Sequence, residues 1–196
     1  METEFEATFP NIDKNVAREK LKSLGALLKR PEYTQKRVVF NLPTGHEIKG
    51  GWLRVRDEGD KTTMSLKVIN GSRIEDQKEI YLEVSGFQQA ELFLMSIGCE
   101  RKAYQESKRE LWILDNVEIT IDEWPFLEPY MEVEGKSKES VKHVSEKLGF
   151  DFDKALFCSV AKLYNLKYGI SEDIINNQTP EITFEGKNPF GKNETK

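Results

Sequence analysis

The chain has 196 residues, with 29 basic and 34 acidic side chains and a formal net charge of -5. This length suffices for one well-packed domain, and the acidic balance argues against a protein that binds a nucleic acid polymer through its phosphate backbone. No apolar run approaches the ~18 residues of a membrane-spanning helix, and the N-terminus lacks the apolar core of a signal peptide. We therefore expect a cytoplasmic protein without a membrane partner. Cys99 and Cys158 lack metal-type spacing and are expected to be reduced thiols.

The first half of the chain alternates strands with helices. Residues 4–9 form a strand that places Glu4, Glu6 and Thr8 on one face and apolar side chains on the other. Further apolar periodicity predicts helices over 13–24 and 87–97, and strands over 34–40, 52–56, 63–69 and 78–84. Arg30-Pro31 is expected to break the chain before the second strand, and residues 57–60 to form a solvated hairpin turn.

The second half continues this pattern and then changes composition. The spacing predicts strands over 105–114, 117–121 and 130–134, and helices over 137–148 and 152–164. From residue 171 onward Asn, Gln, Pro, Gly and Lys predominate, which is typical of loosely ordered segments. We therefore expect one domain over residues 1–170 and a loosely ordered extension over 171–196.

Long charged side chains recur on the polar faces of the predicted strands. The basic members of this set are Arg37, Arg54, Arg56, Lys67 and Arg109, and the acidic members are Glu4, Glu6, Glu79, Glu83, Glu118, Asp122, Glu132 and Glu134. A sheet with one face in water explains any single strand. The whole set favours a sheet curled into a barrel with its charged face inside, where charges must be paired or bind ions. Such an interior suits a polyphosphate held by arginines together with a divalent metal held by carboxylates.

The same residues carry a resemblance to a known family. The chain resembles the CYTH superfamily, also called triphosphate tunnel metalloenzymes, over roughly residues 2 to 150. Its opening signature, Glu-x-Glu-x-Lys, is similar to Glu4-Phe5-Glu6-Ala7-Thr8 here. The other matching segments are Leu53-Arg54-Val55-Arg56, Lys67, the acidic strand 79–83, Ser107-Lys108-Arg109, and the final carboxylates Asp122, Glu132 and Glu134.

This resemblance implies an α+β fold in which a closed eight-stranded antiparallel barrel forms a tunnel with a polar charged interior and helices packed outside. It implies that Mg²⁺ or Mn²⁺ is held by carboxylates from the set Glu4, Glu6, Glu79, Glu83, Asp122, Glu132 and Glu134. It also implies that the triphosphate is bound by Arg37, Arg54, Arg56, Lys67 and Arg109. The expected partner is a small-molecule triphosphate or nucleotide, and the protein is expected to be a monomer or a homodimer.

Two positions depart from the family pattern. Thr8 stands where the signature has lysine, and Ser107 stands at the first basic position of the later strand, so the tunnel lacks two positive charges. Because the signature lysine is absent, no catalytic residue is assigned. Three functions follow from the resemblance: hydrolysis of tripolyphosphate, thiamine triphosphate or a nucleotide; cyclisation of ATP by a class IV-type adenylate cyclase; and non-catalytic binding of a polyphosphate or nucleotide.

Overall fold

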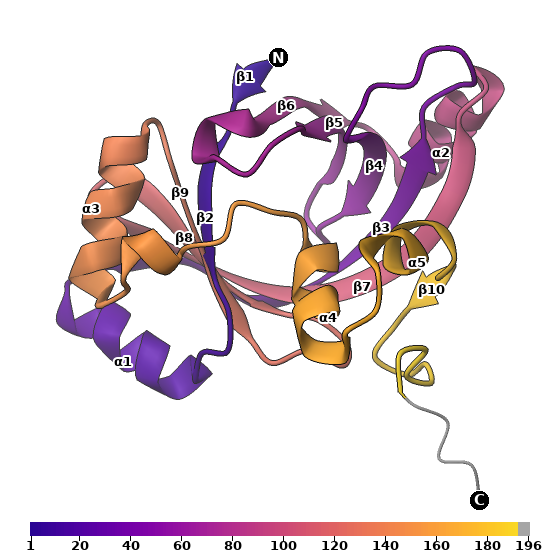
Figure 1. Ribbon diagram of the computed structural model, residues 1–196. Coiled ribbons are helices and arrows are strands. Elements are labelled where there is room, and N and C mark those ends of the chain that lie inside the picture. Colours follow the sequence, from indigo (N-terminus) through magenta and orange to yellow (C-terminus); the bar gives the residue numbers. More distant parts are fainter. Residues whose placement is uncertain (192–196) are drawn as a thin grey trace, which may run out of the picture.

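The computed structural model describes residues 1–191. Its fold is a strongly curved antiparallel sheet with helices on the outer side (Figure 1). The strands are β1 (Glu2–Thr3), β2 (Phe5–Phe9), β3 (Leu27–Asn41), β4 (Gly51–Asp57), β5 (Thr62–Ile69), β6 (Gln77–Val84), β7 (Glu100–Leu114), β8 (Val117–Glu123), β9 (Tyr130–Gly135) and β10 (Glu181–Ile182). The α-helices are α1 (Lys14–Ser23), α2 (Phe87–Ser96), α3 (Lys138–Leu148), α4 (Val160–Tyr168) and α5 (Glu172–Asn177), with short 3-10 turns at Ile74–Asp76 and Phe152–Lys154.

The N-terminal strand nearly closes the sheet into a barrel. The hydrogen-bonded order is β1-β6-β5-β4-β3-β7-β8-β9-β2, so the two consecutive pieces β1 and β2 pair with opposite ends of the sheet. The predicted barrel is thus confirmed. Nine strands lie on this path instead of eight because Glu2–Thr3, which precede the strand predicted over 4–9, form the separate strand β1; Glu4, between β1 and β2, donates its backbone N–H to the carbonyl of Gln77.

The apolar faces of the strands point outward and are mostly covered by helices, although Ile80 and Leu82 of β6 are exposed. Ala7 and Phe9 of β2 pack in one core with Leu21 of α1 and with Val141 and Val144 of α3. A second core joins α2 to β3 and β4, and a third joins α4 and α5 to the segment around Trp124. Because the side chains of a strand alternate between faces, this outward packing directs the polar residues into the barrel.

Strand β3 is much longer than the segment predicted over 34–40. It runs through Arg30-Pro31, where the sequence predicted a break, and its pairing with β7 shifts register on both sides of Arg30. Such irregularities leave a strand residue without its ladder hydrogen bonds, which is the condition under which proline is tolerated in a sheet.

The C-terminal part of the chain also differs from the sequence prediction. The helix predicted over 152–164 is a 3-10 turn, a connecting segment and then α4. Residues 171–191 contain α5 and β10 and bury Ile175, Ile182 and Phe190, so loose order does not hold for them; residues 192–196 lie outside the described residues. Strand β10 pairs with β7 at Tyr104 and Gln105, beyond the point where β8 leaves that strand. The domain boundary at residue 170 stays a prediction.

No helix in the described part of the chain is both long and apolar enough to cross a bilayer.

Candidate functional site

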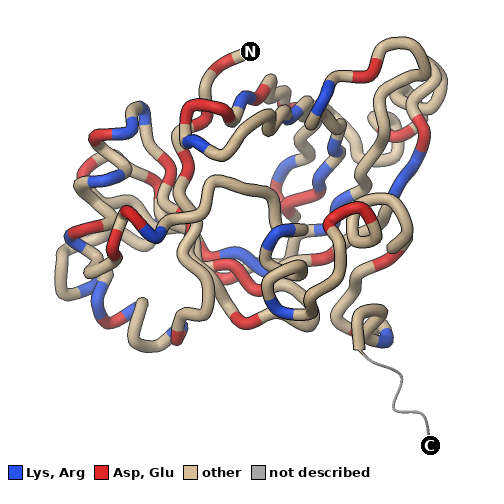
Figure 2. Tube along the Cα trace, in the orientation of Figure 1, with Lys and Arg blue, Asp and Glu red and all other residues tan. Residues whose placement is uncertain are grey.

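The barrel encloses a cavity of about 950 Å³ that is lined by charged side chains of both signs. Its wall comes from the inward-facing residues of the strands, and from residues 155–160, which cross one side of the barrel between α3 and α4 (Figure 1). Figure 2 shows that basic and acidic residues both occur on the strands around the barrel. All five basic residues predicted to bind triphosphate line this cavity, namely Arg37, Arg54, Arg56, Lys67 and Arg109.

Strand register explains why these cations converge. Arg37 of β3 lies directly opposite Arg56 of β4, and Arg54 lies two residues further along the same face. Side chains directly opposite in an antiparallel pair have Cβ atoms about 5 Å apart, so these guanidinium groups share one region of the interior. Arg109 reaches the same space from β7, where Tyr33 of β3 is its partner.

Arg37 is buried without a carboxylate partner among residues 1–191. Its terminal nitrogen Nη2 donates to Gln35 Oε1 at 2.9 Å and to Ser107 Oγ at 2.6 Å, and its guanidinium lies 4.4 Å from the centre of the Trp124 ring. Its Nε atom has no hydrogen-bond partner among the described residues. Burial, together with repulsion from Arg54 and the other arginines, holds the pKa of Arg37 well below its ordinary value. The positive charge at this position therefore lacks a counter-ion among the residues that the structure describes.

The other four cations are paired with carboxylates. The nitrogen–oxygen distances are 3.2 Å for Arg54–Glu79, 2.6 Å for Arg56–Glu58, 2.8 Å for Lys67–Glu4, and 2.7 and 2.6 Å for Arg109 with Asp122 and Glu132. Burial and repulsion from Arg56 nevertheless lower the pKa of Arg54 to about 10, and the Arg54 Nε atom has no partner among the described residues.

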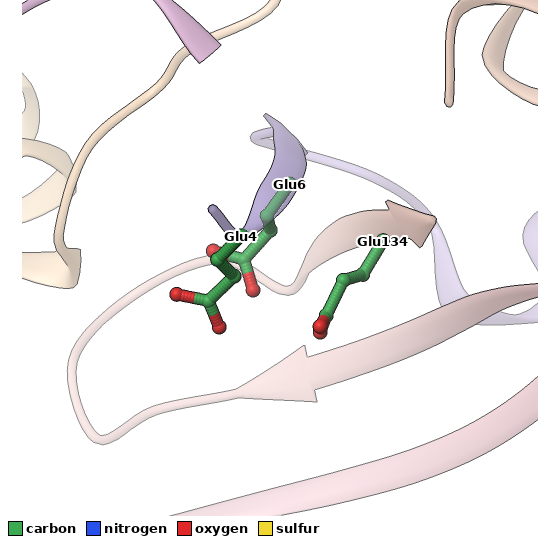
Figure 3. Close-up of side chains that lie close together, drawn as sticks. All are labelled: Glu4, Glu6 and Glu134. Atoms are coloured by element: carbon green, nitrogen blue, oxygen red, sulfur yellow. The ribbon is translucent and has the colours of Figure 1, made fainter. Parts of the chain in front are cut away.

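Three carboxylates form a cluster at another part of the wall. Oxygen atoms of Glu4, Glu6 and Glu134 lie within 4.8 Å of one another, and Figure 3 shows the three side chains side by side. Register accounts for this cluster, because Glu6 of β2 lies opposite Glu134 of β9, and Glu4 precedes Glu6 on the same face.

The cluster carries more negative charge than its surroundings stabilise. Burial and repulsion from Glu132 raise the pKa of Glu6 well above its ordinary value, and burial together with Glu4 raises the pKa of Glu134 to about 7. Burial and Asp122 also raise the pKa of Glu132. For Glu4, burial opposes ionisation, but the Lys67 ammonium outweighs it and lowers the pKa. A divalent cation would stabilise all of these carboxylates in their ionised form.

The remaining predicted metal ligands are placed differently. Glu79 and Glu132 line the cavity, and their role as metal ligands stays a prediction. Asp122 is fully buried behind Arg109, which it binds through both oxygens, and it also accepts a hydrogen bond from Thr120 at 2.6 Å. Glu83 is exposed at the end of β6 and is not part of the cavity wall. The alternation of residues along a strand correctly gives the face of Asp122 and Glu83, but it does not give their depth in the barrel.

The two departures from the family signature both lie inside the protein. Thr8 is 2% exposed, and its backbone forms two hydrogen bonds, of 2.9 and 3.0 Å, with Leu156 in the segment that crosses the barrel. Ser107 is 0% exposed and holds Arg37 together with Gln35. Neither residue supplies a positive charge.

Several residues of the cavity wall were not predicted. Glu58 lies in the turn expected to be solvated, but it is buried and accepts a hydrogen bond from Arg56 Nε at 2.9 Å. Lys61 and Tyr130 also line the cavity, and Trp124 contacts Arg37. Cys158 lies on the wall as well, where burial and the charges of Glu6 and Glu132 raise the pKa of its thiol to about 12. For Tyr130 the sequence did contain a signal, because this residue lies two positions before Glu132 on the same face of β9.

Comparison with known proteins identifies the family. The CYTH domain model matches residues 1–162. The chain belongs to the CYTH family. This family includes adenylate cyclases and triphosphatases that act on triphosphates with divalent metals. A search of curated proteins finds no match to this chain.

Solved structures share the fold at low sequence identity. A conserved hypothetical protein from Pyrococcus furiosus has a TM-score of 0.68 and 21% identity, covering 82% of this chain and 99% of its own. A putative adenylate cyclase from Vibrio parahaemolyticus has a TM-score of 0.70 and 11% identity, covering 83% and 97%. A putative adenylyl cyclase from Hippeastrum, described as revealing a dominant triphosphatase activity, has a TM-score of 0.55 and 13% identity, covering 86% and 97%.

Proposed function

We propose that this protein binds a triphosphate together with Mg²⁺ or Mn²⁺ inside the barrel and hydrolyses it. The observation that carries the proposal is a pair of opposite charge imbalances in one cavity. Arg37 is a buried cation without a carboxylate partner in the described part of the chain, and Glu6 and Glu134 are carboxylates in the wall with raised pKa values. An anionic ligand would neutralise the first group and a metal ion the second, so a metal triphosphate satisfies both.

The arginines provide the chemistry that phosphate recognition needs. A guanidinium offers a planar fork of donors that binds two phosphate oxygens at once. Arg37 is already oriented by Gln35, Ser107 and Trp124, and within residues 1–191 neither Arg37 nor Arg54 has a partner for its Nε–H group. We assign Arg37 as the main anchor of the triphosphate, with Arg54, Arg56, Lys67 and Arg109 completing the clamp. These charges would also stabilise negative charge that develops during transfer.

The carboxylate cluster fits a hard divalent cation. Carboxylate oxygens are the preferred ligands of Mg²⁺ and Mn²⁺, and Glu4, Glu6 and Glu134 supply three within 4.8 Å. We assign these three as metal ligands, with Glu79 and Glu132 close enough along the wall to assist. When bound, the metal supplies Lewis-acid stabilisation of phosphate oxygens. Because Glu134 has a pKa of about 7, binding would release protons at neutral pH.

In the proposed reaction, a water oxygen attacks the terminal phosphorus and the bond to the bridging oxygen breaks. The products are orthophosphate and a shortened phosphate chain; one of the two water protons stays on the orthophosphate and the other passes to the solvent. No side chain is assigned as the general base, since Thr8 replaces the signature lysine. Two alternatives remain from the sequence. If a ribose hydroxyl attacks in place of water, the protein is an adenylate cyclase. If the missing charges at Thr8 and Ser107 prevent turnover, it is a binding protein. Cytoplasmic location and a monomeric or homodimeric state stay predictions.

The test is release of phosphate from tripolyphosphate, ATP and thiamine triphosphate, with Mg²⁺ or Mn²⁺. The decisive variant is Glu4→Ala/Glu6→Ala, and Glu83→Ala is its matched control because Glu83 is an exposed carboxylate outside the cavity. We expect metal-dependent release that the double variant abolishes and the control retains.

Other outcomes would identify the alternatives. Cyclic AMP formed from ATP would identify a cyclase. Metal-dependent thermal stabilisation by a triphosphate without turnover would identify a binding protein. Neither binding nor turnover with any of the three compounds would refute the proposal.

A further inference from the structure

The C-terminal extension contributes part of the cavity wall. The family match ends at residue 162, and the wall includes Glu172, Asn176 and Asn177 of α5. The two neighbours from Pyrococcus and Vibrio align over nearly their whole length but cover only 82% and 83% of this chain. Helix α5 therefore lies beyond the residues that the family model matches.

The residues near α5 are polar, and three of them make no side-chain contact of their own with a hydrogen-bonding partner in the described part of the protein. Gln105 of β7 lies directly opposite Arg37, and Lys102 lies close by in a β-bulge, where Val39 pairs with Ala103 and Phe40 with Arg101. Both line the cavity, as does Asn176. Within residues 1–191, the side chains of Lys102, Gln105 and Asn176 have no hydrogen bond or ion pair.

Gln105 lies between Arg37, the proposed anchor of the triphosphate, and helix α5. Gln105 of β7 lies opposite Arg37 of β3 on one edge of its strand. On the other edge it pairs with Ile182 of β10, and α5 packs on β7. A group attached to an anchored triphosphate would therefore pass Gln105 before it reached α5. Glu172 is within 3.8 Å of Lys162, so this part of the wall holds both acceptors and donors.

Resting on the proposed function, we infer that Lys102, Gln105, Glu172 and Asn176 form a specificity subsite for a hydroxyl-bearing organic group attached to the triphosphate. Amides, a carboxylate and an ammonium group can donate to or accept from hydroxyls, whereas an inorganic triphosphate has no group to place there. A site that leaves such polar side chains unpaired discriminates against ligands lacking the matching groups. The extension thus selects an organic triphosphate with a sugar-like group.

The experiment compares ATP, 2′,3′-dideoxy-ATP and tripolyphosphate as substrates of the full chain. For the unmodified protein we expect kcat/KM to be about tenfold lower for dideoxy-ATP than for ATP, the size of one or two lost hydrogen bonds. Asn176→Ala and Lys102→Met should each lower kcat/KM for ATP by about tenfold and leave tripolyphosphate within about twofold. Gln178→Ala is the control, since Gln178 follows α5 but is exposed and outside the wall.

The outcomes separate this inference from the proposed function. Equal use of ATP and dideoxy-ATP, or an equal loss for ATP and tripolyphosphate in the variants, would overturn the subsite while leaving triphosphate processing intact. Failure to bind or hydrolyse tripolyphosphate would overturn the proposed function and the subsite with it. If the ligands bind without turnover, dissociation constants from calorimetry replace kcat/KM, with the same expected ratios.

Discussion

Replacing Glu134 with glutamine tests whether the carboxylate cluster destabilises the folded protein when no metal is bound. The pKa of Glu134 is raised from 4.5 to about 7 by burial and by Glu4, so the folded protein binds this proton more tightly than the unfolded chain does. The free energy of unfolding must therefore fall as pH rises from about 4.5 to 7, and it changes no further above that range. The difference between the two pKa values corresponds to roughly 3 kcal/mol, a value that solvent screening reduces.

Glu134→Gln removes this penalty while preserving the shape of the side chain. We expect the metal-free variant at pH 8 to be more stable than the unmodified protein by roughly 2–3 kcal/mol, or roughly 5–10 °C in Tm for a chain of this size. At pH 5 the gain should be below about 1 kcal/mol, because most of the penalty has then disappeared.

Thermal unfolding in EDTA at pH 5 and pH 8 measures both values, with Glu83→Gln as an exposed control. Mg²⁺ should reverse the order at pH 8: a metal at about 1,000 times its Kd stabilises the unmodified protein by about 4.1 kcal/mol, which exceeds the advantage of the metal-free variant, and the variant lacks a ligand. An equal effect of Glu134→Gln at the two pH values, or a lower Tm at pH 8 without metal, would refute the reasoning.

Three further variants examine the anchor, the altered signature and the extension. Arg37→Met should weaken binding of tripolyphosphate about 100-fold in calorimetry, through loss of charged hydrogen bonds, without lowering Tm; an unchanged Kd would exclude Arg37 as the anchor. Thr8→Lys should lower stability by about 1–3 kcal/mol in thermal unfolding, because Thr8 is covered by the segment at Leu156; an unchanged Tm would show that lysine still fits. Phe190→Ala should lower the free energy of unfolding by roughly 3 kcal/mol, because the centre of the Phe190 ring lies 4.7 Å from that of Tyr164. A loss below about 1 kcal/mol would show that the extension is not anchored there.

The barrel and most of the site could be predicted because side-chain alternation reports directly on strand faces. Arg54 and Arg56 are two residues apart in a strand, so they must share a face, and the apolar Leu53 and Val55 fix which face meets the core. The same reasoning placed Glu4 and Glu6 together. Alternation contains no information on the partner strand, so the contact of these residues with Glu134 required the register of β2 with β9.

The errors arose where local sequence is a poor guide to burial. Glu58 lies in a turn whose composition is typical of solvent exposure, yet its carboxylate is buried because it accepts a hydrogen bond from the buried Arg56. Ile182 and Phe190 are isolated apolar residues in a polar segment, and their burial depends on the bare edge of β7 and on the aromatic rings of α4. Such contacts are long-range, so no window of sequence around these residues reveals them.

The missing positive charges at Thr8 and Ser107 explain the charge state of the site. Thr8 lies opposite Glu132 in the β2–β9 pair, so a cation at that position would stand next to a carboxylate whose pKa is raised. With threonine there, Glu132 and Glu6 depend on Arg109 and Lys67 and on whatever cation enters the cavity. At Ser107 the hydroxyl orients Arg37 without competing for an anion. The two substitutions therefore increase the need of the carboxylates for a metal, while they leave Arg37 available to the proposed triphosphate.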